Sequence, residues 1–391
     1  MYRNNADRRL WLPCLLLCAL VAEVASADTQ VAPGALQLES ERGVPAIPGD
    51  VDDELEALGS RNREFVLAPL PSRSPLLGWT LAVPVMFLYK PSFTVEEDTT
   101  WISGVMGFYA ENDSWGAGAF HKMSFGGDRW RLMGAVFSSD LNYEYFGIGG
   151  DPDLSIPLNQ PMSLLMAEAL RRVRPNLFVG LRASFSHSEV SLDLPPDLLP
   201  PGVTPPDISS KFDLATVSPR LQFDSRDNQF YPMAGSLIDG TLSFGLESLG
   251  SDRDYEIYKL EFNNYRKFAR SGVLAARVAF EYASGDAPFF VYPAFGSGAD
   301  LRGYQTGSYR DRFLFATQLE YRHRLTQRLG VVGFAGIGTV SDEFGRWGKS
   351  LPSLGAGLRW VVAPKNNMSL RLDVAQGRDD IEFYLGIGEA F

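Results

Sequence analysis

LFVGLRASFSH, at residues 177–187, alternates strictly between apolar and polar side chains. Leu177 and Val179 belong to the apolar series, and Arg182 and Ser184 belong to the polar series. A period of two places successive side chains on opposite faces of a β-strand, so one face of this strand is apolar. The same alternation recurs in two further stretches, YKLEFN at 258–263 and MSLRLDV at 368–374.

The alternating segments often run to about 10–15 residues, against roughly 5–6 for strands of ordinary globular proteins. A tilted strand that crosses a membrane needs about 9–11 residues, with its apolar face toward lipid and its polar face toward a wet lumen. A soluble sandwich would have to bury the charged faces in a dry core, which is costly. The sequence therefore predicts an all-β fold, a 16-stranded antiparallel transmembrane β-barrel of the outer membrane.

The sixteen predicted strands are spread over the chain from residue 79 to its end. They are expected at 79–89, 101–110, 114–124, 129–138, 143–149, 161–173, 177–191, 212–225, 235–247, 253–268, 273–285, 311–325, 330–341, 351–362, 367–375 and 381–391. The short connections at 111–113, 270–272 and 364–367 are expected to be periplasmic turns. The longest connection, 286–310, is expected on the outer side.

The N-terminus has the layout of a secretory signal peptide. A basic start precedes an apolar run, and Ala25 and Ala27 supply the small residues of a cleavage site. We expect residues 1–27 to be the signal peptide, cleaved after Ala27. Residues 28–77, which are rich in Pro and acidic side chains, are expected to form a flexible periplasmic leader, and residues 78–391 to form the barrel.

Composition narrows the class of partner. The net charge of −11 and the acidic pI of about 4.9 argue against nucleic acid. Both cysteines, Cys14 and Cys18, lie in the predicted signal peptide, so no disulfide framework is expected. The expected partners are outer-membrane lipids, the assembly machinery that inserts the barrel itself, and a possible client polypeptide or lipid.

Four motifs occur in a specific order. LQFDSRDNQFYPMAG (221–235) contains Asp224, Arg226, Asp227, Pro232 and Gly235; ADLRGY (299–304) contains Leu301, Arg302, Gly303 and Tyr304; LEYRHRL (319–325) contains Glu320; and GFAGIG (333–338) contains Phe334, Gly336 and Gly338. Together they resemble the C-terminal barrel of the BamA/TamA superfamily of bacterial surface antigens, over about residues 75–391.

The resemblance implies that the loop of ADLRGY folds into the lumen, where its arginine contacts acidic side chains on the inner wall. In FLFATQLEYRHRL (313–325), the alternation puts Glu320 on the inner face, so we expect Arg302 to pair with Glu320. The family usually has Asp where this chain has Gly336. Asp342 is too far along the strand to replace it. The set Leu301, Arg302, Gly303, Tyr304 and Glu320 is the predicted loop lock.

The resemblance gives two further motifs a role. The stretch around Asp224 to Gly235 would be a periplasmic turn. The last strand, with Tyr384, Gly386 and the terminal Phe391, would carry the signal that the outer-membrane assembly machinery reads. Glycines in that strand would also weaken its pairing with the first strand.

The sequence shows few signs of a catalytic or metal-binding site. His121, His187 and His323 lack the spacing of metal ligands, so no metal or other cofactor is expected. No Gly-x-Ser-x-Gly elbow occurs. A lipid-hydrolysing barrel would need Ser and His outside on adjacent strands, and the sequence alone gives no support for such a pair. We therefore expect no enzymatic activity, and we expect Arg359 and Asp373 to form a structural ion pair between neighbouring strands.

The resemblance implies a barrel that assists the insertion or translocation of proteins or lipids, and this chain is similar to the subgroup without periplasmic POTRA domains. Two alternatives remain at this point. The chain could be a passive pore with a charged lumen, or a structural surface protein without transport activity.

Overall fold

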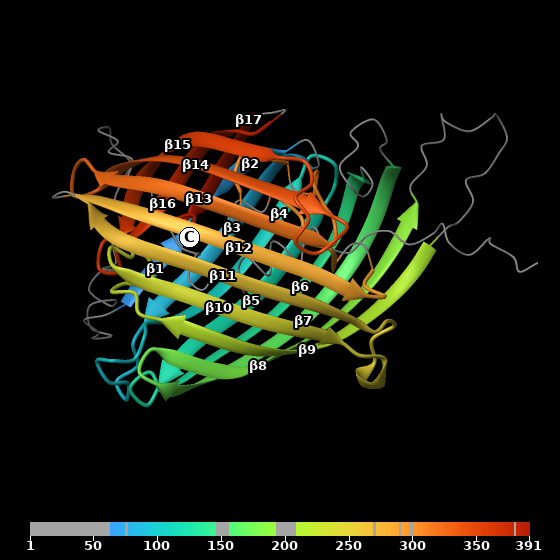
Figure 1. The fold of residues 1–391 in the computed structure, drawn as a ribbon. Helices are drawn as coiled ribbons and strands as arrows, with labels where there is room; N and C mark the ends of the chain where they lie inside the picture. Colours follow the sequence, from blue (N-terminus) through green and yellow to red (C-terminus); the bar gives the residue numbers. More distant parts are fainter. Residues whose placement is uncertain are drawn as a thin grey trace, which may run out of the picture.

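The computed structural model describes residues 63–74, 77–145, 156–192, 209–268, 271–288, 291–296, 301–305, 307–378 and 381–391. The predicted signal peptide, its cleavage site and most of the predicted leader lie outside the described residues. The described residues form one sheet of 17 antiparallel strands that curls into a barrel (Figure 1). No helix among them is long and apolar enough to cross a membrane.

The strands follow one another along the chain. They are β1 (Arg63–Leu67), β2 (Leu70–Ser74), β3 (Gly78–Tyr89), β4 (Trp101–Ala110), β5 (Trp115–Phe125), β6 (Trp130–Tyr145), β7 (Ile156–Arg174), β8 (Leu177–Leu192), β9 (Ser209–Asp224), β10 (Gly235–Gly245), β11 (Tyr255–Phe268), β12 (Gly272–Gly285), β13 (Phe313–Arg324), β14 (Leu329–Ser341), β15 (Leu351–Ala363), β16 (Met368–Gln376) and β17 (Ile381–Ile387). A short 3₁₀ turn, η2 (Glu247–Leu249), precedes β11.

The strand position before β3 is occupied by two short strands instead of one long strand. β1 and β2 both pair with β3, β1 along its second half and β2 along its first half. Ala68 and Pro69 separate them, and a proline cannot donate a ladder hydrogen bond. The sheet therefore includes Arg63–Leu67 and Leu70–Ser74, which lie inside the predicted leader of residues 28–77, so the predicted boundary between leader and barrel at residue 78 was wrong. Charged residues in REFVL hid the strand from the alternation pattern.

The strand prediction also differs at β6. The segments predicted separately at 129–138 and 143–149 form one continuous strand of 16 residues. SSDLNYEY in its second half has too few apolar side chains for a clear alternation. Two predicted strands thus merge into one at β6. The pair β1 and β2, which together take the place of one strand, adds one, so the described wall has as many strand positions as predicted.

From β3 to β17, each strand pairs antiparallel with the next one in the chain. β17 and β2 then lie side by side and bring the last strand next to the first (Figure 1). For the described residues of these two strands, no paired register extends along their boundary. We call this boundary the seam.

Alternating side chains separate the two faces of the wall. On β13, Glu320 and Arg322 are buried, whereas Leu319 and Tyr321 are exposed. Exposed apolar side chains recur around the outside, on β3, β7, β8, β11, β15 and β17. Apolar side chains outside and ion pairs inside are the arrangement of a transmembrane barrel, as the sequence predicted.

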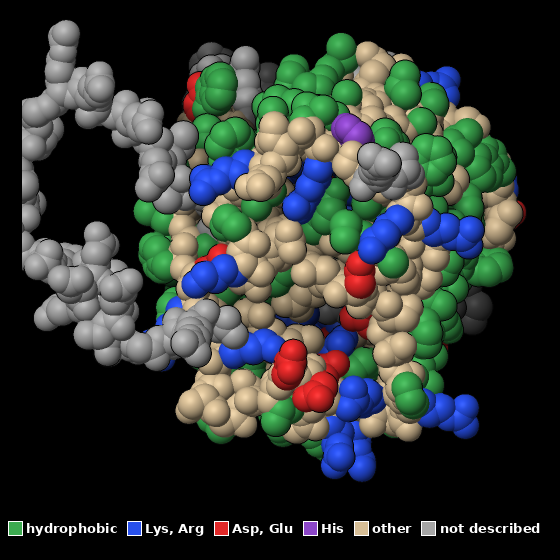
Figure 2. Space-filling model, turned by 90° about the vertical axis from the view of Figure 1, so that its left-hand side faces the viewer, with side chains coloured by type: hydrophobic (Ala, Val, Ile, Leu, Met, Phe, Trp, Pro, Cys, Tyr) green, Lys and Arg blue, Asp and Glu red, His purple; other side chains and the backbone are tan. Residues whose placement is uncertain are grey.

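The two ends of the barrel differ. β1 begins and the chain finishes at one end, which we call the terminal end; the connection 286–312 lies at the other, the loop end. Figure 2 faces the terminal end and shows hydrophobic side chains on the flanks, with Lys and Arg side chains spread over the end face. The strand order puts the turn 111–113 at the loop end and the turn 364–367 at the terminal end. The prediction that both are periplasmic turns, on the same side of the membrane, was therefore wrong.

Candidate functional site

The described parts of the connection 286–312 pack inside the barrel. Phe295 and Leu301 are fully buried and form an apolar cluster with Tyr304, Leu314 and Val340. The cluster joins the loop to side chains of β13 and β14. The loop therefore rests on the inner wall instead of standing above the rim.

Arg302 is the centre of the contact between loop and wall. Its side chain is completely buried, and its two terminal nitrogens donate to Glu320 on β13 at 2.6 Å and to Asp373 on β16 at 2.7 Å. Its Nε donates to Gln318 at 3.3 Å, and the guanidinium lies 3.3 Å from the centre of the Phe334 ring. The pair Arg302–Glu320 expected from the alternation of β13 is thus present, and Asp373 is a second acidic partner.

Gly336 departs from the family pattern for a steric reason. A Cβ at this position would lie 2.7 Å from the carbonyl oxygen of Thr317 and 2.8 Å from Leu301. A Cβ at Gly338 would lie 2.7 Å from Phe295. The glycines of β14 leave room for the apolar side chains of the loop, and the acid missing from β14 is supplied by Asp373, two strands further on.

Gly303 and Tyr304 fix the loop to the last strand. The hydroxyl of Tyr384 accepts hydrogen bonds from the backbone nitrogens of both residues, at 2.8 and 3.2 Å, and donates to the carbonyl of Tyr304 at 3.1 Å. Tyr304 donates its own hydroxyl to the carbonyl of Pro352 at 2.5 Å. At Gly303, φ is +101° and a Cβ would lie 2.6 Å from the backbone of Gly377, so only glycine suits this position.

A second layer of charges lies below the loop, toward the terminal end. Arg359 on β15 binds Asp373 at 2.5 Å and Glu389 at 2.7 Å. Arg322 on β13 binds Glu320 at 2.7 Å and donates to the carboxyl end of Phe391 at 2.6 Å. The Arg359–Asp373 pair predicted between neighbouring strands is present, and it belongs to the same network as Arg302.

The C-terminus turns into the barrel. β17 ends at Ile387, and Gly388 has a φ of +85°, which redirects the chain. Phe391 is buried against Tyr265 and Val273 on the inner wall. The predicted strand 381–391 is therefore too long, and Phe391 does not stand on the outer face of the last strand. Glu389, in the same segment, is buried and pairs with Arg359.

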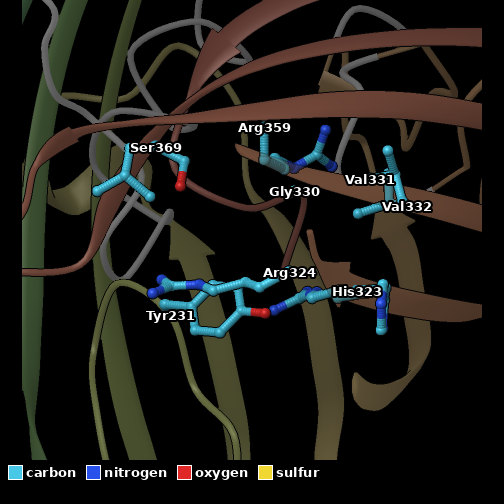
Figure 3. A pocket seen from close by; sticks show the side chains of 10 residues that line it. Tyr231, His323, Arg324, Gly330, Val331, Val332, Arg359 and Ser369 are labelled. Atoms are coloured by element: carbon cyan, nitrogen blue, oxygen red, sulfur yellow. The ribbon is translucent and has the colours of Figure 1, made fainter. Parts of the chain in front are cut away.

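A small pocket opens beside this charged layer (Figure 3). Arg324 lies with its guanidinium 4.1 Å from the ring centre of Tyr231, and Ser369 and Arg359 stand opposite. Burial raises the pKa of the Tyr231 hydroxyl, and the negative charge of Glu389 adds to this increase. Nη1 of Arg322 has no hydrogen-bond partner among the described residues.

The turn between β9 and β10 closes part of the terminal end. Asp224 binds Arg226 at 2.9 Å, and Asp227 accepts hydrogen bonds from the backbone nitrogens of residues 233 and 234. Gly235 has a φ of +100°, and a Cβ at this position would lie only 2.1 Å from a backbone oxygen. Pro232 is buried in the same turn. The residues of this motif thus shape a structured turn at the end of the barrel where the chain finishes.

This turn also reaches the seam. Phe230 packs in an apolar cluster that contains Val66 and Met86 from the start of the barrel and Met368 and Ile387 from its end. At the rim, Glu64 of β1 accepts hydrogen bonds from the backbone of Lys365, at 3.2 Å, and from the side chain of Asn366. Side chains therefore join the two sides of the seam at the terminal end.

The arrangement as a whole holds elements in place. The charged groups of the lumen pair with one another, and no group of three or more His, Cys, Asp or Glu side chains suited to a metal ion occurs among the described residues. Gly386 lies next to the Arg371 guanidinium and leaves it space on the inner face. Asp373 and Tyr384 are the important residues that sequence reasoning did not assign to the loop. Their position on inward-facing strand sites was the only available signal.

Comparisons with known proteins agree with this architecture. Residues 104–391 match the family model of the Omp85 superfamily domain. The fold is similar to a crystal structure of BamA from Haemophilus ducreyi lacking POTRA domains 1–3 (TM-score 0.54, 13% identity, 86% of this chain and 76% of that one). It is also similar to CdiB from Escherichia coli (TM-score 0.56, 11% identity, 86% and 68%) and to CdiB from Acinetobacter baumannii (TM-score 0.54, 12% identity, 84% and 60%). A comparison with curated protein sequences gives no match.

Proposed function

Because the chain belongs to the Omp85 superfamily and is an outer-membrane β-barrel, we propose that it assists the insertion or translocation of client polypeptides or lipids at the outer membrane. The seam between β2 and β17 is the observation that carries this proposal. Its two strands are short, with five residues in β2 and seven in β17, whereas β7 alone has 19. Short, weakly paired edges expose backbone donors and acceptors to which another strand can add.

The inside of the barrel supports a seam that can separate while the rest stays rigid. The loop lock ties β13, β16 and β17 together through Arg302 and Tyr384, all on one side of the seam. The other side is joined to it at the terminal end by Glu64 and by the Phe230 cluster. Opening would therefore begin near the loop end and would leave the charged network intact.

Side chains buried inside the barrel argue against a passive pore. Phe295, Leu301 and Arg302 of the loop are buried against the inner wall, and Phe230 and Phe391 are buried at the terminal end. In this proposal the lumen network holds the loop and carries out no reaction. Lipids contact the apolar outer wall, and the client approaches the seam.

A seam cross-link tests the proposal. Cysteine pairs with one member in Leu70–Ser74 and one in Ile381–Ile387 are screened for disulfide formation, since both native cysteines lie in the predicted signal peptide. The locked protein, in liposomes, is given a urea-unfolded outer-membrane barrel as the client. We expect oxidation to abolish acceleration of client folding and reduction to restore it.

The matched control joins β17 to its other neighbour. Val374 and Phe383 are directly paired and both face outward. A disulfide between cysteines at these positions adds the same chemistry but leaves the seam free, so client folding should continue. Full activity in the seam-locked protein would refute the role of the seam.

A further inference from the structure

One row of polar side chains crosses the outer face of the barrel near the loop end. Ser138 on β6 is paired with Ser163 on β7, Ser163 with His187 on β8, and His187 with Asp213 on β9. The residues directly before and after each of them in the strand point inward or are buried. Since successive side chains of a strand lie on opposite faces, these four side chains point outward. The topology thus brings a serine, a histidine and an aspartate together in the order of a nucleophile, a base and an orienting acid.

The histidine and the aspartate already have the geometry of such a pair. Nδ1 of His187 lies 2.6 Å from Oδ1 of Asp213, and both side chains are about half exposed, at 53% and 47%. A carboxylate at Nδ1 accepts the proton of that nitrogen and leaves Nε2 as the basic nitrogen of a neutral imidazole. A buried structural pair would not present its base to the surface in this way.

Ser163 stands directly across from His187. Opposite residues of an antiparallel pair have Cβ atoms about 4.5–5.5 Å apart, within reach of a hydroxyl and an imidazole. In the structure the hydroxyl of Ser163 rests 3.4 Å from that of Ser138. A rotation about χ1 turns it toward His187, and hydrogen bonds between nucleophile and base are often formed only with substrate bound. Ser138 is then placed to donate to an oxygen that becomes negative beside Ser163.

The surroundings indicate the class of substrate. The outer wall exposes Val136, Leu165 and Phe185, each two residues along its strand from the row, in the direction of the terminal end. Two residues from it toward the loop end, Lys211 and Glu189 form an ion pair at 3.4 Å. The row therefore lies where the apolar surface meets the polar rim, at the depth at which the acyl esters of a phospholipid lie beneath its charged headgroup.

We propose that Ser163, His187 and Asp213 form a hydrolytic site for acyl esters of membrane lipids on the outer face of the barrel. The Ser163 oxygen attacks the ester carbonyl carbon while His187 takes the hydroxyl proton. The C–O bond to the glycerol breaks, and His187 returns the proton to the leaving alcohol. Water then attacks the acyl-serine, His187 again takes and returns a proton, and a fatty acid and free Ser163 result. This site is separate from the seam and does not depend on it.

Fluorophosphonate labelling of the full chain in detergent–phospholipid micelles tests the site, together with release of fatty acid from phosphatidylethanolamine vesicles. We expect the probe to modify Ser163, as located by mass spectrometry of the peptide. Ser163→Ala should remove labelling and hydrolysis, and His187→Asn or Asp213→Asn should slow both by about 10²–10⁴-fold, the usual contribution of a general base.

Ser191→Ala is the matched control, since Ser191 is a serine on β8, the strand of His187, but lies outside the row. It should label and hydrolyse at the rate of the unmodified chain. Folding of each variant is followed by the mobility shift of the unheated barrel on gels. Absence of labelling in the folded unmodified chain, or labelling of Ser163 that His187→Asn leaves unchanged, would overturn the proposal.

Discussion

Arg302 and Asp373 are 71 residues apart in the chain, yet the guanidinium of one lies 2.7 Å from the carboxylate of the other. Asp373 also binds Arg359 at 2.5 Å, so it joins the loop to the wall and one strand to the next. Both side chains of the Arg302–Asp373 pair are fully buried. A buried ion pair contributes mainly through the cost of removing one partner, because the other charge then stays uncompensated.

We expect Arg302→Ala to release the loop. Loss of the guanidinium leaves Glu320 and Asp373 without one of their partners, at a cost of about 3–5 kcal/mol for a broken buried pair. Proteinase K should then cut within 286–312 in liposome-embedded protein, and bilayer conductance should increase. Arg346→Ala removes an exposed arginine and should change neither result. An unchanged digestion pattern for the first variant would contradict the loop lock.

Gly336→Ala should destabilise the barrel even though alanine is small. Its Cβ would press on a backbone oxygen of β13 and on Leu301 of the loop. Overpacking of this kind costs typically about 1–3 kcal/mol. Urea unfolding followed by tryptophan fluorescence measures the change. Gly333→Ala is the control, since a Cβ there meets no atom within 4 Å, and equal stabilities of the two variants would refute the steric reading.

Phe391→Ala distinguishes packing from signalling. Because Phe391 is buried inside the barrel, we expect its removal to lower the free energy of unfolding by about 3–5 kcal/mol. The measurement uses protein refolded in detergent, without any assembly machinery. If the refolded variant were as stable as the unmodified chain, the residue would act only as the assembly signal that the sequence suggested.

Glu64→Ala should loosen the seam at the terminal end. Its carboxylate accepts from the backbone of Lys365 and the side chain of Asn366 and thereby holds β1 to the turn after β15. Hydrogen–deuterium exchange should become faster in β1, β2 and β17. Glu64→Gln keeps an acceptor at the same place and should exchange more slowly than the alanine variant. Identical exchange in all three proteins would show that other contacts hold the seam.

The features of this fold that depend on residues close together in the chain could be predicted from the sequence. Period-two alternation places Glu320 inside and Leu319 outside, because the pleat of a strand puts successive side chains on opposite faces. The same rule, with the motif around Arg302, is enough to predict the Arg302–Glu320 pair. It fails where the pattern is weak, as at Arg63–Leu67 and in the second half of β6.

Other contacts depend on how strands far apart in the chain are brought together. The placement of Asp373 beside Arg302, of Tyr384 beside Gly303 and of Phe391 inside the barrel follows from wall curvature and from the turn at Gly388. The row from Ser163 to Asp213 depends on the register of three strands, and a shift by one residue would turn one member to the other face. Where the alternation is clear, as in β13, the sequence by itself determined which face each side chain occupies. Only the tertiary structure decided which side chains meet, because register and closure are long-range properties of the whole sheet.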